Sequence, residues 1–239
     1  MISHYKCNDN LPSTNVIDAQ GTNNLVASFN TGTRSTPDAK IDRCLDFVGT
    51  SDDYASKANV VIPDSGTIAF WIKADMGDQI AENIYPVGWQ VKMAIYGPSA
   101  GVNEASGLLT YDGADYRGYN WGDQSIYDDT WHNYVVTWNA TVVRLYLDGA
   151  KVGADKAHAN EIAGLAPGPI AIGGGWASNY GNHTGKLDDV RFYSKELSIN
   201  EIKGIYNLGY GTEGATGCAS SSSSSSSFSS SSSSSSVTP

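Results

Sequence analysis

Short segments in which apolar and polar residues alternate, separated by turn-forming residues, constrain the fold of this chain most strongly. In residues 66–74, the apolar side chains of Ile68, Phe70 and Ile72 occupy every second position. A period of two residues is that of a β-strand with one buried face. The same pattern returns in residues 132–138, so we expect a chain built of strands.

A hairpin signal follows the second of these segments. Residues 142–147 alternate again, and the dipeptide Asp148-Gly149 comes directly after them. Glycine tolerates the positive φ that a tight two-residue turn requires, so the stretch 131–152 predicts three consecutive antiparallel strands. Further strands are expected at residues 43–48, 90–96, 107–111, 169–173 and 186–193. With 26 glycines and turn signals between most of these runs, the pattern favours an all-β sandwich of two antiparallel sheets.

One segment has helical character. Ser198 and Glu201 have the spacing of a capping box, in which each side chain bonds the backbone N–H of the other residue. Leu197 and Ile202 stand where a hydrophobic staple forms, and Gly209 is expected to end the helix. We therefore expect one short C-terminal helix packed on the sandwich.

A serine tract lies near the end of the chain. Every residue from 220 to 236 is serine except Phe228. A segment with one large apolar side chain cannot bury enough surface to offset the entropy lost on ordering, so it is expected to be flexible. The sequence thus predicts one folded domain over residues 1–213 and a disordered polyserine linker over residues 214–239.

The formal net charge of −10 excludes some partners. Nucleic acids and anionic membranes require clustered cations, whereas the 15 Lys and Arg residues are scattered among 25 Asp and Glu residues. No window approaches about 20 consecutive apolar residues, so no membrane span is expected. The first residues, MISHY, have no apolar signal-peptide core; we expect either a cytosolic chain or a piece of a secreted protein.

The three cysteines, Cys7, Cys44 and Cys218, match no CxxC or zinc-binding spacing. Either one disulfide forms and one thiol is left over, or all three thiols are free. Cys7 and Cys44 lie in strand-like segments, so we expect a disulfide between them; the alternative is a bond that ties Cys218 to the domain. Because disulfides persist in oxidising compartments, this expectation implies a secreted or periplasmic protein.

Seven segments of the chain occur in the order seen in laminin-G-like, concanavalin A-like jelly-roll domains. They are NVIDAQG from Asn15, LDFVGTSDDY from Leu45, GTIAFWIK from Gly66, TWHNYV from Thr130, LYLDG from Leu145, KLDDVRFY from Lys186 and LSINEIKGIY from Leu197. The folded part therefore resembles one jelly-roll domain of this type. Such domains include lectin-like sugar-binding modules, pentraxins, adhesion domains and some glycanases, so function has to be argued from the site.

The serine tract resembles the linkers of secreted polysaccharide-degrading enzymes. In those enzymes a polyserine linker joins a carbohydrate-binding module to a catalytic module. By this resemblance we expect a secreted protein whose linker leads to a catalytic domain.

Catalysis by carboxylates is not expected. A retaining glycanase needs two carboxyl groups about 5 Å apart, and the family pattern E-x-D-x-x-E or E-x-D-x-E is absent. The adjacent acid pairs are Asp52-Asp53, Asp128-Asp129 and Asp188-Asp189. Neighbouring residues of a strand point to opposite faces, so these pairs suit turns or cation binding better. Asp112 and Asp115 are the best remaining pair, without an evident proton donor.

Two motif matches are interpreted as accidental. Residues 97–101 fit G-x-S-x-G but lie in β-rich sequence instead of between a strand and a helix. Residues 209–214 fit G-x-G-x-x-G but follow the helix and lead into the linker. The four histidines show no metal-binding spacing, and His132 is expected to be structural because it belongs to the family-like TWHNYV segment.

Sugar binding requires aromatic rings beside amides, carboxylates or arginine. The chain has 6 Trp and 14 Tyr, of which Trp71, Trp131 and Trp138 are expected to be packing residues of strands. The other three tryptophans lie in loop-like stretches that also contain tyrosines, residues 85–89, 116–123 and 174–183. The predicted sugar-binding residues are Trp89, Tyr116, Arg117, Tyr119, Asn120, Trp121, Trp176, Asn179, Tyr180 and His183. The alternative is that these rings cover sheet edges.

The resemblance also implies a structural Ca²⁺ site. Bacterial sugar-binding relatives hold one calcium with backbone carbonyls and an Asp of the final strand, matched here by Asp188 or Asp189. Because calcium takes six to eight oxygen ligands, Asp9 or Asn8 is expected to contribute. The alternative is that Asp188 and Asp189 bond loop amides. A pentraxin-type calcium site is not expected, because residues 173–182 contain no carboxylate.

These observations predict a non-catalytic carbohydrate-binding module of a secreted polysaccharide-degrading enzyme. Its partners would be a polysaccharide or oligosaccharide and the catalytic domain tethered through the linker, and the module itself would be a monomer. The net charge favours neutral glycans over polyanionic ones unless Arg117 or calcium intervenes. The alternatives are a glycan lyase or glycoside hydrolase on the same fold and a protein-adhesion domain.

Overall fold

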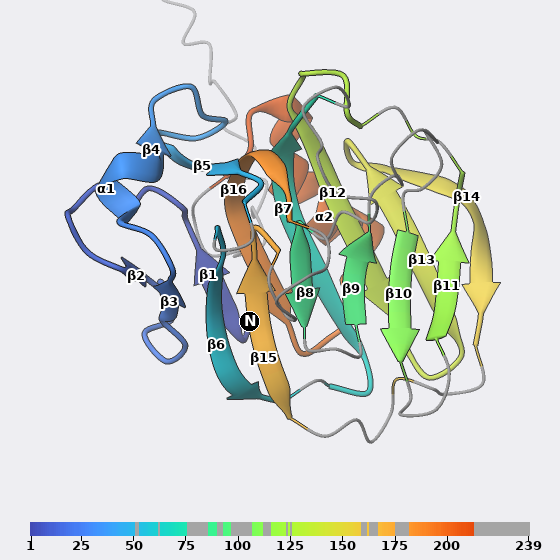
Figure 1. Cartoon of the computed structure of the whole chain (residues 1–239). Helices are drawn as coiled ribbons and strands as arrows, with labels where there is room; N and C mark the ends of the chain where they lie inside the picture. Colours follow the sequence, from blue (N-terminus) through green and yellow to red (C-terminus); the bar gives the residue numbers. More distant parts are fainter. Residues whose placement is uncertain are drawn as a thin grey trace, which may run out of the picture.

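The computed structural model describes residues 1–50, 53–61, 63–75, 86–89, 93–96, 107–111, 116–122, 124, 126–158, 162, 167–174 and 182–212. These residues form a sandwich of two antiparallel sheets, which confirms the all-β jelly-roll prediction (Figure 1). The predicted boundary between residues 213 and 214, the serine tract and Cys218 lie outside the described residues.

Each sheet has eight strands. Sheet A runs in the order β14 (Ala150–Ala157), β13 (Val142–Leu147), β12 (His132–Trp138), β7 (Gly66–Lys73), β16 (Thr184–Tyr193), β5 (Cys44–Val48) and β4 (Ser35–Thr36), and β1 (Ser3–Tyr5) also pairs with β16. Sheet B runs in the order β11 (Tyr116–Asn120), β10 (Gly107–Tyr111), β9 (Met93–Tyr96), β8 (Val87–Trp89), β15 (Gly168–Ile172), β6 (Ala55–Val60), β3 (Leu25–Ala27) and β2 (Asn15–Val16). The strands β11 and β14 are thus edge strands of opposite sheets.

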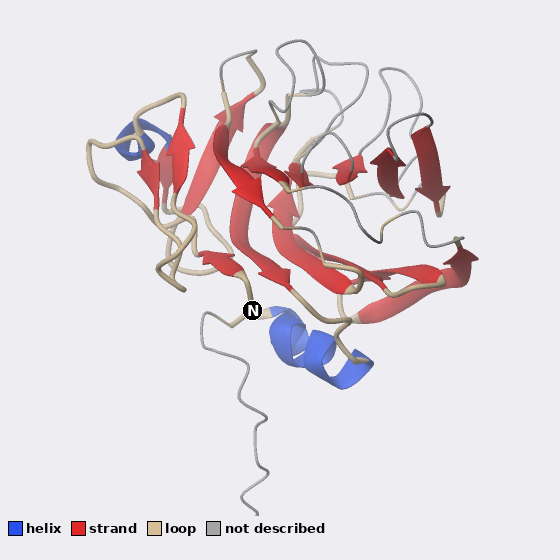
Figure 2. Cartoon of the chain, turned by 90° about the horizontal axis from the view of Figure 1, so that it is seen from below, coloured by secondary structure: helices blue, strands red, loops and turns tan. Residues whose placement is uncertain are grey.

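The alternation along β7 explains how the sheets pack. Ile68, Phe70 and Ile72 are at most 1 % exposed and belong to the main core. Fully burying such side chains contributes roughly 1.5–3 kcal/mol each. The second face of β7 is buried as well, because Ala69 packs in a separate cluster with residues of α2 (Ile199–Tyr206), which lies on the outside of the sandwich (Figure 2).

Two of the three tryptophans expected to pack in strands are fully interior. Trp138 is 0 % exposed and belongs to the main core. Trp71 is 1 % exposed and stacks on Tyr206 of α2, with ring centroids 5.7 Å apart. Trp131 is half-buried and precedes β12, so for this residue the prediction holds only in part.

The predicted hairpin is confirmed. Asp148 has φ 49° and Gly149 has φ 74°, so both central residues of the turn between β13 and β14 are left-handed, as a type I′ turn requires. A side chain at Gly149 would also place its Cβ 2.8 Å from Tyr206 Cδ1. Glycine is thus favoured at position 149 for two reasons: it adopts the left-handed backbone conformation, and it leaves room for Tyr206 of α2.

The capping box is confirmed and the predicted helix end is wrong. Glu201 N donates to Ser198 Oγ at 3.4 Å, and Ser198 N donates to Glu201 Oε2 at 2.9 Å. The helix ends before Gly209, because Asn207 is the C-cap with φ 47°. A one-turn helix, α1 (Thr31–Arg34), was not predicted; Asn30 caps it by accepting from Gly32 N. No helix in the described residues has the length and apolar character that crossing a membrane requires.

The predicted disulfide between Cys7 and Cys44 is wrong, because both residues are free, buried thiols. Cys7 lies past the end of β1 with φ 57°, and its Sγ is 3.6 Å from Tyr5 O. Cys44 Sγ is 3.4 Å from Asp38 O, so each thiol donates to a nearby carbonyl. Burial raises the pKa of both thiols. The argument for an oxidising compartment therefore loses its support from these cysteines.

Replacing Gly66 by alanine is expected to lower the free energy of unfolding by about 1–3 kcal/mol through overpacking. A Cβ there would lie 2.3 Å from Trp138 Cζ2 and 2.8 Å from Tyr193 O. Gly204→Ala in α2 is the matched control: its Cβ would meet no atom within 4 Å, and alanine is favoured over glycine in helices by about 1 kcal/mol. Urea unfolding measures both changes, and a Gly66→Ala protein as stable as the parent would contradict this packing.

Candidate functional site

The edge of the sandwich where β11 and β14 lie carries the described part of the predicted sugar-binding set. β11 is the edge strand of sheet B and β14 is the edge strand of sheet A, and the two lie side by side (Figure 1). Trp121 follows β11 directly and bridges the two sheets, because its Nε1 donates to Ala154 O of β14 at 3.0 Å. We call this surface the β11–β14 edge.

Trp121 is held in a defined position at this edge. Its side chain is half-buried and packs against the main core, and its backbone carbonyl accepts from Gln124 Nε2 at 2.7 Å. A Cβ at Gly153 would lie 3.3 Å from Trp121 Cδ1, so the glycine lets the indole lie close to β14. The ammonium of Lys156 lies 5.8 Å from the indole ring centroid. The result is a rigid ring with part of its surface open to solvent.

Two exposed polar residues lie on the strand that precedes Trp121. Arg117 and Asn120 are exposed on β11. Asn120 Oδ1 accepts from Gly122 N at 2.5 Å, which fixes the carbonyl end of the side chain and leaves its NH₂ group as a donor for a ligand. Aromatic, amide and guanidinium groups are the kinds of group that hydroxyl-rich ligands require.

The structure contradicts two of the predicted sugar contacts. Tyr119 is 7 % exposed, and its ring packs in the core and meets His158 edge-on with centroids 6.1 Å apart. It points inward because residues on a strand alternate between faces. His183 is 0 % exposed, and its ring lies 6.3 Å from that of Phe47. Neither ring nitrogen of His183 has a hydrogen-bond partner in the described part of the chain, and burial lowers its pKa to about 3.

The remaining predicted residues are placed only by their backbone or not at all. Trp89 ends β8 and Tyr116 begins β11. Trp176, Asn179 and Tyr180 lie outside the described residues, as do Asp112 and Asp115. Their part in binding stays a prediction.

The adjacent acid pairs act as turn and loop formers. Asp53 Oδ1 accepts from Arg34 Nε at 3.1 Å, and Asp53 Oδ2 accepts from Val48 N. Asp128 Oδ1 accepts from the backbone N of Thr130 at 2.9 Å and from its Oγ1 at 2.7 Å. Each of these carboxylates is thus occupied by nearby donors.

Asp9 and Asp188, the carboxylates predicted to bind calcium, accept hydrogen bonds from backbone N–H groups. Asp188 Oδ2 accepts from Lys40 N at 3.0 Å and from Ile41 N at 2.8 Å, and Asp9 Oδ1 accepts from Ile17 N at 3.2 Å. N–H groups present partial positive charge where a cation would need free oxygen lone pairs. No group of three or more His, Cys, Asp or Glu side chains that could hold a metal ion occurs within the described ranges. These carboxylates therefore bond loop amides, and the calcium site stays a prediction.

His132 makes the structural contacts expected of it. Its Nδ1 lies 2.8 Å from Asp148 Oδ2, and Asp148 Oδ1 accepts from Asn133 N at 2.8 Å. The hydrogen bond with Asp148 raises the pKa of His132. This contact ties the start of β12 to the β13–β14 turn.

A buried ionic cluster joins β1 to β16, and nothing in the local sequence predicts it. His4 Nε2 lies 2.6 Å from Asp189 Oδ1, and Arg191 contacts both oxygens of Asp189 at 2.9 and 2.8 Å. All three residues are at most 2 % exposed. Asp189 has φ 52° and lies where the register of β16 against β7 shifts. The cluster thus lies at an irregularity of the last strand.

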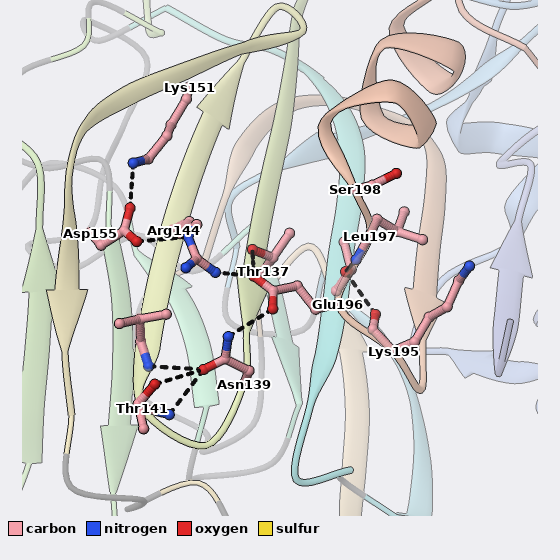
Figure 3. A network of polar contacts seen from close by, with 12 residues as sticks. Thr137, Asn139, Thr141, Arg144, Lys151, Asp155, Lys195, Glu196, Leu197 and Ser198 are labelled. Atoms are coloured by element: carbon pink, nitrogen blue, oxygen red, sulfur yellow. Dashed lines mark hydrogen bonds and ion pairs between the residues drawn. The ribbon is translucent and has the colours of Figure 1, made fainter.

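A second, more exposed network covers the outer face of sheet A beside the β11–β14 edge (Figure 3). Arg144 pairs with Asp155 at 2.9 Å and with Glu196, and Lys151 pairs with Asp155. Asn139 Nδ2 donates to Glu196 Oε2 at 2.8 Å. In this network Asp155 contacts Arg144 and Lys151, and Glu196 contacts Arg144 and Asn139.

Sequence reasoning missed the contribution of β14 to the site. Ala154 anchors the Trp121 indole and Lys156 places its ammonium by the ring, although they lie more than 30 positions away in the chain. Their immediate neighbours, AKVGADKA, contain no aromatic residue. Only the pairing of strands brings them to Trp121.

A family model described as the concanavalin A-like lectin/glucanases superfamily matches residues 49–203. None of the curated proteins matches the chain. Among solved structures, domain 4 of a GH43 extracellular arabinanase from Geobacillus stearothermophilus, in complex with arabinotriose, is similar with a TM-score of 0.61 and 15 % identity. That match covers 88 % of this chain and 98 % of that domain.

Two toxin domains are similar as well. The receptor-binding domain of botulinum neurotoxin type G matches with a TM-score of 0.62 and 13 % identity, covering 87 % of this chain and 51 % of that one. The binding domain of Paraclostridial mosquitocidal protein 1 matches with a TM-score of 0.62 and 16 % identity, covering 86 % and 51 %. The chain thus spans about half the length of these domains, and at such identities the likeness concerns the fold alone.

Proposed function

The chain belongs to the concanavalin A-like lectin/glucanases superfamily, and from this premise we propose that it is a non-catalytic carbohydrate-binding module. It binds a polysaccharide or oligosaccharide by contact with aromatic rings and by hydrogen bonds to hydroxyl groups. The observation that carries the proposal is the half-buried Trp121 indole, fixed by Ala154 O, which follows a strand with exposed Arg117 and Asn120. A solved domain of the same fold is in complex with arabinotriose, which supports a sugar as ligand.

The use of the acids supports a binding role over catalysis. In the described residues Asp53, Asp128 and Asp188 accept hydrogen bonds from backbone N–H groups, and Asp189 is buried against Arg191. A glycanase needs a carboxyl group that can give a proton to the leaving oxygen and a second one facing the sugar. Carboxylates held in this way stabilise the fold instead of acting on a sugar.

The wider context is part of the proposal. The module is secreted as a monomer, and the serine-rich segment tethers it to a catalytic domain that degrades the polysaccharide. A flexible tether raises the local concentration of the catalytic domain at a bound substrate without any new contact. The linker resemblance and the extracellular arabinanase domain of the same fold support this context.

Trp121→Ala is expected to weaken glycan binding about tenfold, the scale of one well-placed aromatic contact. Trp121→Tyr, which keeps a ring and gives up the Nε1 bond to Ala154 O, is the matched control and is expected to retain most of the affinity. Isothermal titration against soluble plant and algal polysaccharides measures both, with thermal unfolding to establish that each variant is folded. Equal affinity of the Ala variant and the parent would place the site elsewhere.

The catalytic alternative is tested with the same preparations. A glycoside hydrolase would release reducing ends, and a lyase would release unsaturated products that absorb in the ultraviolet. We expect neither product from the purified chain. If either product appears, the chain is an enzyme and the proposal of a non-catalytic module is wrong.

A further inference from the structure

The β11–β14 edge carries the ammonium of Lys156 beside the Trp121 indole, in a protein whose net charge is −10. Arg117 lies on β11, Arg144 on β13, and Lys151 and Lys156 on β14. On the outer face of sheet A, Arg144 pairs with Asp155 and Glu196, and Lys151 pairs with Asp155.

Lys156 differs from the other two cations of the β13–β14 pair. Arg144 and Lys151 both pair with Asp155, whereas Lys156 makes no ion pair within the described part of the chain. Its side chain is half-buried, and its backbone pairs with that of Val143, a core residue. The stem therefore starts on the inward face of β14, and the ammonium reaches Trp121, 5.8 Å from the ring centroid. A partly desolvated ammonium without a counterion favours the approach of an anion.

We propose that the glycan recognised at this edge is acidic: the Lys156 ammonium pairs with a carboxylate of a uronic acid or with a sulfate ester, while the sugar ring contacts the Trp121 indole. This inference rests on the proposed function and specifies its ligand. It replaces the neutral glycan that the net charge favours. Because salt screens charges beyond about 8–10 Å, an anion bound beside Trp121 responds to the Lys156 ammonium more than to the net charge of the chain.

The test compares glycans of one backbone type with and without charge. The full chain is titrated with polygalacturonate and its methyl ester, with a sulfated galactan and its desulfated form, and with neutral arabinan. We expect the acidic forms to bind more tightly than their neutral counterparts, with affinity that falls as salt is raised. Lys156→Gln is expected to weaken binding of the acidic form about tenfold, the scale of one charge-assisted hydrogen bond. Lys151→Gln, whose ammonium already pairs with Asp155, is the matched control and is expected to change it little.

The outcomes separate this inference from the function it rests on. Tighter binding of polygalacturonate than of its methyl ester would identify a carboxylate as the bound anion. Tighter binding of the sulfated galactan than of its desulfated form would identify a sulfate ester. Binding of neutral arabinan alone, or equal affinity of Lys156→Gln and the parent for the acidic glycans, would overturn the inference and leave the binding module intact. No binding of any glycan would overturn both. The salt dependence of the parent protein decides the question if Lys156→Gln fails to fold.

Discussion

Replacing Asp189 by alanine is expected to lower the free energy of unfolding by about 3–5 kcal/mol, the cost of leaving one partner of a buried ion pair alone. The guanidinium of Arg191 contacts both oxygens of Asp189 and is 0 % exposed, so the variant would leave a cation in the core without its counterion. The His4 imidazole would lose its 2.6 Å contact as well, which holds β1 on β16. Urea unfolding at pH 7 measures the loss, and hydrogen exchange reports the release of β1.

Asp155→Ala is the matched control for this prediction. Asp155 also pairs with an arginine, but its side chain is 33 % exposed and Arg144 keeps its second partner, Glu196 (Figure 3). Exposed pairs contribute about 0–1 kcal/mol, so little change is expected. Equal losses in the two variants would mean that burial of the Asp189 cluster is not what makes it stabilising.

Acidification from pH 7 to pH 4 is expected to remove about 3 kcal/mol of stability through His183, at about 1.4 kcal/mol per pKa unit. Burial lowers the pKa of His183 in the folded protein to about 3, from an ordinary value of 6.5. The unfolded chain therefore binds a proton below pH 6.5 that the folded chain rejects. The stabilisation is fully present above pH 6.5 and is lost as the pH falls toward 3.

The variant His183→Leu isolates this effect, because it removes the titrating ring and keeps an apolar side chain beside Phe47. We expect the difference in unfolding free energy between pH 7 and pH 4 to shrink by about 3 kcal/mol relative to the parent. His132→Gln is the control of opposite sign. The pKa of His132 is raised by Asp148, so its contribution is present below pH 6.5 and is lost as the pH rises through the folded pKa. An unchanged pH dependence in His183→Leu would refute the assignment.

The parts of the fold that sequence reasoning predicted are those set by local rules. The strands β7, β12, β13 and β16 follow from alternation, the β13–β14 turn from Asp148-Gly149, and the start of α2 from its capping box. Each of these signals lies within a few residues of the element it specifies. The very short strands β2 and β4 carry no such signal, because two residues cannot establish a period.

The candidate site was predictable only in part. The cluster around Trp121 was visible as a local density of rings and polar residues, and Trp121, Arg117 and Asn120 lie at the surface as expected. Tyr119 and His183 belong to the same aromatic stretches but are buried. Composition cannot tell which face of a strand a ring occupies, because a shift of one residue reverses every side chain.

The sequence by itself determined the class of fold and the kind of surface this protein presents, since periodicity, turn residues and capping are properties of neighbouring positions. Only the tertiary structure decided which residues meet. It left Cys7 and Cys44 as separate thiols and placed His4 of β1 against Asp189 of β16. It also brought Lys156 beside Trp121. The physical reason is that contacts between sheets depend on register and packing over distant strands, which no local pattern encodes.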